Sequence, residues 1–328
     1  MKRMLVVMIV LLGVREALAA GSPVRPVHTY SIVAYDQETG QMGVAVQSHW
    51  FSVGSLVIWG EAGVGVVATQ SLVEMSYGPL GLQLMKAGKT ADQALDALLA
   101  VDEYADVRQV AMVDADGNVA AHTGEKCIPA AGMVVGDGFS VQANMMLNDT
   151  IWPAMAAAYR SAKGPLADRL LAALEAAQAA GGDIRGKQAA AILVVDAVGT
   201  GLSWQGRLVD LRVEDHPEPL KELRRLLTLQ KAYDHMNAGD AYMTEGSIDQ
   251  ALAEYREAEK LVPDNLEMQY WHAVTLAGAG RVDESLPIFK KVFEKDPNWI
   301  ELTKRLPGVD LLPGEPAVLG RILGVIQQ

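Results

Sequence analysis

Cysteine is almost absent from the sequence, since Cys127 is the only one among 328 residues. A single cysteine excludes an intramolecular disulfide, so the folded state has to be stabilised by core packing even in an oxidising compartment. The six histidines form no HExxH motif and no paired metal spacing, and there is no CxxC pair. We therefore expect no structural metal and no cofactor.

Basic residues are also scarce. The chain has 28 Lys and Arg residues against 40 Asp and Glu residues, which gives a formal net charge of −12. This balance argues against nucleic acid or an anionic membrane surface as a partner, because both attract positively charged proteins. The length and the 50% hydrophobic content allow two domains and a sizeable core.

Long apolar runs are missing except at the start of the chain. Lys2 and Arg3 precede an apolar run at 4–14, and Ala-Leu-Ala at 17–19 provides the cleavage pattern of a secretory signal peptide. The run is too short for a permanent transmembrane anchor. A charged pair at 15–16 is unusual beside a cleavage site, so a retained signal anchor is the alternative. We expect residues 1–20 to be removed and the protein to be exported, periplasmic or secreted, with no stable membrane span.

A β-hairpin opens the remainder of the sequence, over residues 29–48. Two apolar segments rich in β-branched residues are separated there by a four-residue turn that ends in glycine, which is typical of tight antiparallel hairpins. A turn centred on its middle two residues places Thr29 opposite Ser48 and Ser31 opposite Val46. Hydroxyl groups should therefore meet at one end of the sheet, and two more strands follow directly.

Pairs of helices alternate with strands further along the chain. Thr90 and Gln93 form a capping box, which marks the start of one helix. Antiparallel hairpins between helix pairs favour a layered α/β/β/α sandwich and argue against a doubly wound nucleotide-binding fold. Helices are predicted at 78–87, 90–100, 150–162, 166–180, 220–230 and 317–326, and strands at 107–114, 119–123, 133–143, 187–196 and 207–213.

The C-terminal part of the sequence contains an internal repeat. A polar, proline-containing linker is predicted at 214–219, and a helical domain at 220–328. The pairs Gly246 and Gly280, Tyr255 and Phe289, and Pro263 and Pro297 are each separated by 34 residues. This period resembles that of tetratricopeptide helical hairpins and implies two repeats, at about 232–265 and 266–299. The repeats would either bind a protein partner or act as a structural spacer.

Four segments of the N-terminal region carry a family resemblance: TYSIVA at 29–34, GVAVQS at 43–48, GVGVVATQS at 63–71 and SYGP at 76–79. They resemble the family catalogued as domain of unknown function 1028, which is similar to a branch of the N-terminal-nucleophile hydrolase superfamily. The resemblance implies a mixed α/β (α+β) domain at 28–213, folded as a four-layer αββα sandwich.

The superfamily resemblance also implies a nucleophile, Thr29. In such enzymes a residue freed by cleavage attacks an amide carbon, and its own α-amine serves as the general base. Thr29 matches the leading threonine of the family, and its methyl group restricts the rotamer. The activity requires a cut between His28 and Thr29, because signal-peptide removal alone leaves the threonine nitrogen acylated. No lysine lies between Lys2 and Lys86, so the α-amine is the only evident base.

Other polar residues at strand ends are candidates for the same site. Ser48 and Gln70 would orient the nucleophile or donate hydrogen bonds to an oxyanion. Ser71 would contact the substrate, and Ser31 is the alternative nucleophile if cleavage falls after Tyr30. For each of these side chains, the competing interpretation is an ordinary role at the end of a strand.

Cys127 is a second alternative nucleophile. His122 lies five residues before it, and a neighbouring imidazolium lowers the pKa of a thiol, but lone cysteines usually serve as small buried residues. The family pattern carries a cysteine here, followed by Gly and Gln-x-Asn, which identifies Gln142 and Asn144 as substrate-binding candidates. This sequence has Met133 where relatives tend to have histidine, which weakens any role built on an imidazole there.

The run GGDIRGKQ at 181–188 mimics the phosphate-binding GxxxxGK loop. It lacks the final Ser or Thr, and it leaves a helix and enters a strand, which is the reverse of the required context. We therefore reject nucleotide binding. The run is closer to the GGDxRGxQ of the family, which makes Asp183 and Arg185 candidates for substrate binding. The alternative is a helix C-cap followed by an Asp/Arg pair that fixes the loop.

Together these features favour an exported enzyme of the amidohydrolase type that cleaves an amide bond in a small or peptide-like substrate. The alternative is a non-catalytic envelope binding or scaffold protein that keeps the hydrolase-like fold and recruits a partner through the repeats. A homo-oligomer is compatible with either function, and fold alone does not specify the substrate.

Overall fold

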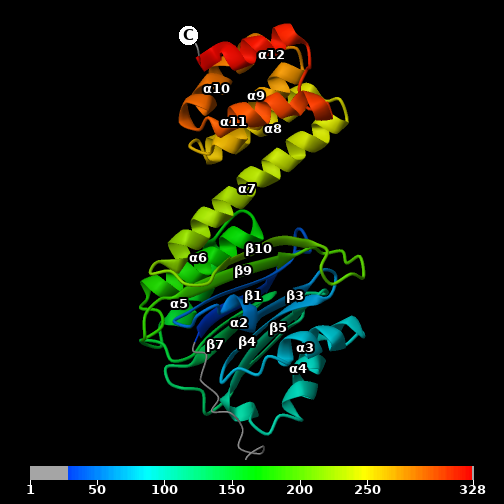
Figure 1. Ribbon diagram of the computed structural model, residues 1–328. Coiled ribbons are helices and arrows are strands. Elements are labelled where there is room, and N and C mark those ends of the chain that lie inside the picture. The colour runs from blue at the N-terminus through cyan, green and yellow to red at the C-terminus, as the bar shows by residue number, and fades with distance from the viewer. Residues whose placement is uncertain (1–28, 327–328) are drawn as a thin grey trace, which may run out of the picture. The chain divides into compact units, whose positions relative to one another are not determined.

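The computed structural model describes residues 29–326, which form two compact units that divide after Arg224 (Figure 1). The predicted signal peptide at 1–20 lies outside the described residues. Within 29–326, none of the helices combines the length and the apolar character needed to cross a membrane.

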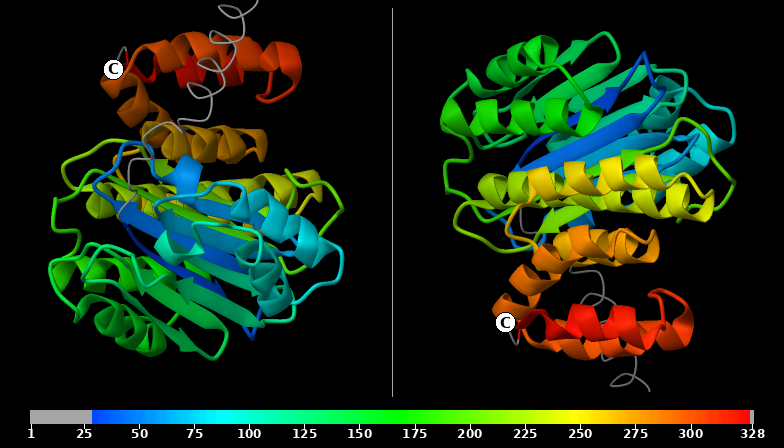
Figure 2. Two further views of the ribbon diagram at one scale, coloured as in Figure 1. Left: turned by 90° about the horizontal axis from the view of Figure 1, so that it is seen from below. Right: turned by 90° about the horizontal axis from the view of Figure 1, so that it is seen from above.

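Two antiparallel sheets form the centre of the first unit (Figure 2). The six-stranded sheet has the order β10-β9-β2-β1-β8-β7, and the four-stranded sheet has the order β3-β4-β5-β6. The strands are β1 Thr29–Tyr35, β2 Met42–Ser48, β3 Ile58–Glu61, β4 Gly65–Ser71, β5 Arg108–Asp114, β6 Val119–Thr123, β7 Gly132–Gly136, β8 Phe139–Ala143, β9 Ala189–Val195 and β10 Arg207–Val213.

Helices cover the outer face of each sheet. Helices α5 (Ile151–Ser161) and α6 (Leu166–Ala179) pack on the six-stranded sheet, whereas α3 (Tyr77–Lys86) and α4 (Ala91–Leu99) pack on the four-stranded sheet. A one-turn helix, α2 (Gly54–Val57), precedes β3. The layers therefore follow the order helices, sheet, sheet, helices, which confirms the predicted αββα sandwich.

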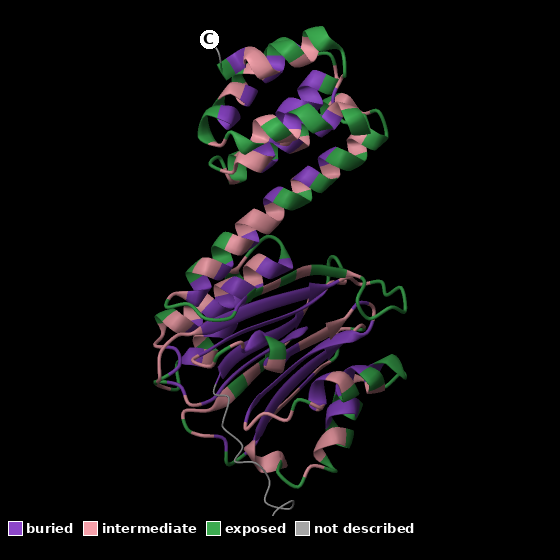
Figure 3. Cartoon of the chain, in the orientation of Figure 1, coloured by how far each residue is buried: buried purple, intermediate pink, exposed green. Residues whose placement is uncertain are grey.

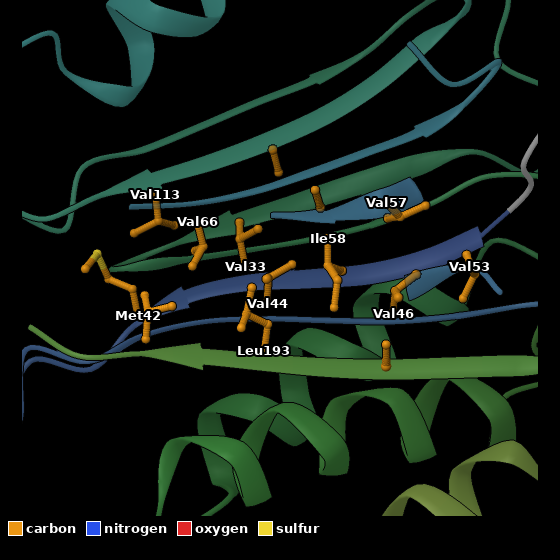
Figure 4. Close-up of a cluster of buried hydrophobic side chains, with 14 of the residues drawn as sticks. Val33, Met42, Val44, Val46, Val53, Val57, Ile58, Val66, Val113 and Leu193 are labelled. Atoms are coloured by element: carbon orange, nitrogen blue, oxygen red, sulfur yellow. The ribbon is translucent and has the colours of Figure 1, made fainter. Parts of the chain in front are cut away.

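The main core of the first unit lies between the two sheets (Figure 4). Val33 of β1, Val66 of β4 and Leu193 of β9 meet there, because alternate residues of each strand point to the same face. Figure 3 shows most strands of both sheets as buried. Burial of each such side chain is worth about 1.5–3 kcal/mol, so this layer is a principal source of stability in a domain without disulfides.

The predicted hairpin register is confirmed, since Thr29 pairs with Ser48 and Ser31 with Val46 in the β1–β2 ladder. Its turn closes through Asp36, whose Oδ1 accepts a hydrogen bond of 3.1 Å from the Glu38 amide. The predicted capping box at the start of α4 is confirmed as well. Local sequence signals are sufficient here because turn chemistry and side-chain alternation act over a few residues.

Two predicted elements are wrong in their extent. Residues 133–143, predicted to form one strand, instead form a hairpin of β7 and β8. Gly138 adopts a positive φ of 70° there, which lets the chain reverse. The separate helix at 220–230 is the first part of α7, which runs without a break over Pro219–Thr244. No glycine or proline interrupts residues 220–238, so nothing in the sequence ends the helix at 230.

The second unit consists of helical hairpins. The hydroxyl of Tyr255 in α8 donates to Asp240 in α7 at 2.6 Å, and a Cβ atom at Gly239 would lie 2.4 Å from the Tyr255 ring. The repeat therefore needs a small residue at 239 so that α7 and α8 can approach closely. The remaining helices are α8 Ile248–Leu261, α9 Leu266–Gly278, α10 Val282–Lys295, α11 Asn298–Arg305 and α12 Pro316–Leu323.

The tail of the chain completes the core of the second hairpin. Ile322 of α12 is fully buried and belongs to the same hydrophobic cluster as Tyr270, Phe289 and Phe293. Phe289 occupies the position equivalent to Tyr255 of the preceding hairpin, 34 residues earlier. The C-terminal helix thus covers apolar surface that two repeats alone would leave exposed.

Candidate functional site

Polar side chains replace apolar ones at the end of the inter-sheet layer where β1 begins. All of them are fully buried. They continue the strand alternation that points the core residues inward, so they lie between the two sheets. They are Thr29, Ser31, Ser48, Gln70, Gln109, Ser140, Gln142 and Asn144. We refer to the four carboxamides, Gln70, Gln109, Gln142 and Asn144, as the amide cluster.

Gln109 of β5 is at the centre of the amide cluster. Its Oε1 accepts hydrogen bonds from Gln70 Nε2 at 2.7 Å and from Asn144 Nδ2 at 2.9 Å. Its Nε2 donates to the Ala143 carbonyl and to Thr123 Oγ1, both at 2.9 Å. Because Gln109 belongs to the four-stranded sheet and Ala143 to the six-stranded sheet, these bonds join the two sheets across the site.

The backbone of Thr29 is held by the same cluster. Its carbonyl oxygen accepts hydrogen bonds from the Asn144 amide at 3.1 Å, from Asn144 Nδ2 at 3.4 Å and from Gln70 Nε2 at 3.3 Å. The Oε1 atom of Gln70 is buried and has no hydrogen-bond partner in the described part of the chain. Uncharged donors therefore fix the start of β1. The Oε1 atom of Gln70 remains next to it as an acceptor that is unpaired among the described residues.

Ser31 and Ser48 flank Thr29 within the six-stranded sheet. Gln142 Nε2 donates to Ser31 Oγ at 2.6 Å, and Ser140 donates to Gln142 Oε1 at 3.0 Å. Ser48 is the cross-strand partner of Thr29. The structure thus brings together five of the predicted site residues around Thr29, namely Ser31, Ser48, Gln70, Gln142 and Asn144.

Ser71 and Cys127 lie near one another at the end of β4. Ser71 directly follows Gln70 at the end of β4, but its φ of 73° departs from extended backbone, so strand alternation does not determine where its buried hydroxyl points. The Cys127 thiol donates to the Arg108 carbonyl at 3.3 Å. The His122 ring instead contacts the Ala105 carbonyl at 2.8 Å, so the structure shows no thiol–imidazole bond.

The electrostatics of Cys127 do not favour a nucleophile. Burial raises the pKa of the thiol above its ordinary value, and the nearby Ser71 side chain and Gly124 backbone only partly oppose the rise. The side chain is 5% exposed. These features are typical of a small buried residue, which was the competing interpretation of this cysteine.

Native protein is therefore expected to react with iodoacetamide at least about tenfold more slowly at pH 8 than the urea-unfolded chain. A raised pKa reduces the thiolate fraction at every pH below it, so the native rate should increase as the pH rises towards the pKa. Mass spectrometry of samples quenched at intervals measures both rates. Rapid alkylation of the native chain at pH 7 would contradict this prediction and restore Cys127 as a candidate nucleophile.

Asp183 and Arg185 stabilise the loop between α6 and β9. The fully buried Asp183 carboxylate accepts hydrogen bonds from the His49 amide at 3.1 Å, the Arg185 amide at 2.9 Å and Arg185 Nη2 at 2.7 Å. Burial and then the charge of Asp183 raise the pKa of Tyr30, whose side chain lies on the face of β1 opposite to Thr29. The pair therefore lies outside the amide cluster, and its contacts are those of a loop-fixing pair.

Sequence reasoning missed three polar residues of the site: Gln109, Thr123 and Ser140. The signal for Gln109 was present, because it lies on the same inward-facing side of β5 as Ala111 and Val113, which are apolar. A buried carboxamide at such a position needs partners, which both the neighbouring strands of its own sheet and the opposite sheet supply. Among residues 29–326, no group of three or more His, Cys, Asp and Glu side chains is arranged to hold a metal ion.

Comparisons with known proteins agree with the division of the chain into two units after Arg224. No curated protein matches the sequence. The crystal structure of a Silicibacter pomeroyi protein, described under the DUF1028 family model, matches with a TM-score of 0.54 and 30% identity. The match covers 61% of this chain and 88% of that chain. The model of a TPR repeat matches residues 239–280. The model of the Family of unknown function (DUF1028) matches residues 29–223, and the chain belongs to that family.

Proposed function

We propose that the protein is an exported amide-bond hydrolase whose nucleophile is Thr29, freed by cleavage after His28. The observation that carries the proposal is the position of Thr29 at the first residue of β1, inside the polar end of the inter-sheet layer. A strand-leading hydroxyl among fixed hydrogen-bond donors is the arrangement that such chemistry needs.

The proposed reaction proceeds in two steps. Thr29 Oγ1 attacks the amide carbon of the substrate while its proton passes to the freed α-amine, and the tetrahedral intermediate collapses by breaking the C–N bond. The leaving amine takes the proton from the α-ammonium. Water, deprotonated by the same amine, then attacks the ester on Thr29; the acyl C–Oγ1 bond breaks, the α-ammonium returns its proton to Oγ1, and the carboxylic acid is released.

The amide cluster supports this reaction by positioning and by polarity. Asn144 Nδ2 and Gln70 Nε2 already point at the Thr29 backbone, at 3.4 and 3.3 Å from its carbonyl oxygen. Donors held in this way cost little reorganisation when an oxyanion forms nearby. The buried, unpartnered Oε1 of Gln70 offers an acceptor for the N–H groups of a freed α-amine.

A specific observation favours a second candidate function, a non-catalytic scaffold. Thr29 is 0% exposed, and its carbonyl accepts three hydrogen bonds, which is also how an ordinary internal strand residue is accommodated. The TPR repeat at 239–280 suggests protein interaction, which a scaffold and an enzyme would both use.

The intact mass of protein recovered from the exported fraction tests the proposal. We expect a chain that begins at Thr29 and that hydrolyses members of an amide library. A chain that begins at Ala20 or Gly21 would have a blocked threonine nitrogen and would contradict the mechanism, whatever its activity. The control is the same mass measurement on protein from the cytoplasmic fraction, which should retain the preceding residues.

A further inference from the structure

A cavity of about 570 Å³ lies inside the second unit, between α7, α9 and the segment after α11. Trp271, Val274 and Leu311 supply apolar walls, and Thr275 and Tyr255 contribute hydroxyl groups. Two carboxylates, Asp240 and Asp310, are at its edge and are exposed. No lysine or arginine occurs among the described residues that line it.

The carboxylate of Asp240 is fixed in place by Tyr255. The tyrosine hydroxyl donates to Asp240 Oδ1 at 2.6 Å. Burial, and next the hydrogen bond with Asp240, raise the pKa of this tyrosine, so the hydroxyl keeps its proton and stays a donor at every physiological pH. Asp240 therefore presents an oriented negative charge beside an apolar wall.

We propose that this cavity receives a lysine or arginine side chain of a polypeptide partner, together with a neighbouring aliphatic residue. The aliphatic stem of a basic side chain packs on apolar surface while its charged end reaches a carboxylate. Trp271 adds attraction for a cation placed over its ring. The volume exceeds what one side chain fills, which leaves space for the aliphatic neighbour.

Charge complementarity selects this partner over others. Two carboxylates without a basic residue on the lining repel an acidic segment and attract a basic one. A polypeptide is favoured over a free amine because the TPR match, residues 239–280, includes most of the cavity lining. The proposal does not depend on Thr29, since the cavity belongs wholly to the second unit.

Gly278 gives a way to fill the cavity without disturbing the fold. It lines the cavity on α9, and an added Cβ atom there would meet no atom within 4 Å. Gly320 on α12 is a matched control, because its Cβ would also meet nothing within 4 Å and it does not line the cavity. Leucine is a better helix former than glycine at both sites, so neither change should weaken its helix.

The test measures fluorescence anisotropy of two labelled octapeptides, alternating lysine and leucine or alternating glutamate and leucine, with the full chain. We expect saturable binding of the basic peptide alone. Gly278→Leu, and the double change Asp240→Asn with Asp310→Asn, should each weaken it by about tenfold or more. Gly320→Leu and Asp264→Asn, which alter residues outside the cavity, should leave the affinity unchanged.

Several outcomes would overturn the proposal: no binding of the basic peptide, equal binding of both peptides, or equal loss in Gly278→Leu and Gly320→Leu. A thermal unfolding curve for each variant separates lost binding from lost fold. Asp240→Asn keeps an oxygen that accepts from Tyr255, so its curve should match that of the unaltered chain. If size-exclusion chromatography shows a dimer that only Gly278→Leu dissociates, a second copy occupies the cavity and the basic partner is excluded.

Discussion

A Thr29→Ala chain that begins at residue 29 is expected to hydrolyse amides at least about a thousandfold more slowly than the chain with threonine. The variant loses the attacking oxygen but keeps the α-amine and the backbone carbonyl that the amide cluster binds. Its stability should change by about 1 kcal/mol, which shifts Tm by about 2–4 °C. Both proteins should be released from a cleavable leader, so that the comparison does not depend on self-processing.

Two controls make this comparison specific. Thr29→Ser keeps a hydroxyl at the same position and should retain measurable turnover. Thr39→Ala changes a threonine in the turn at the opposite end of the β1–β2 hairpin and should leave kcat/KM unchanged. Undiminished turnover in Thr29→Ala would exclude Thr29 as the nucleophile and direct attention to Ser31, two residues further along the same face.

Asp183→Ala is expected to lower the free energy of unfolding by about 3–5 kcal/mol. The fully buried carboxylate accepts hydrogen bonds from the His49 amide, the Arg185 amide and the Arg185 guanidinium, so its loss leaves those donors without their acceptor. Urea denaturation followed by circular dichroism measures the change. Asp137→Ala is the control, because Asp137 is exposed and should cost about 0.5 kcal/mol or less.

The same variant distinguishes the two interpretations of Asp183. A loop-fixing residue affects stability first, and activity changes only as far as the loop is displaced. A substrate-binding residue would raise KM while the urea midpoint stays unchanged. An unchanged midpoint together with a raised KM would therefore show that the loop-fixing interpretation is wrong and that Asp183 contacts the substrate.

Local patterns were sufficient to predict most of the fold. The alternation in β1 and β2 and the turn between them determine the hairpin register, which places Thr29 opposite Ser48. Prediction was less successful where a short turn decides the path of the chain. Asp137 and Gly138 form the two-residue turn between β7 and β8, and the prediction of one continuous strand overlooked this Asp-Gly hairpin signal.

The site was predictable along strands but not between sheets. Ser48 and Ser31 follow from pairing within one sheet. Gln109 does not, because its partners Asn144 and the Ala143 carbonyl belong to segments 34 or more residues away and meet it only when the sheets stack. Sheet stacking depends on the packing of the whole core, so its register is not encoded in any short segment.

The amide cluster also makes the pH dependence of the proposed reaction simple to interpret. Carboxamides do not ionise between pH 2 and pH 12, so Gln70, Gln109, Gln142 and Asn144 contribute no titration step of their own. In a Thr29 reaction the group that gains or loses a proton among these residues is the amine created by cleavage of the chain. A single acid-side ionisation in kcat/KM would then be the kinetic signature of that cleavage, readable in an activity assay without any measurement of mass.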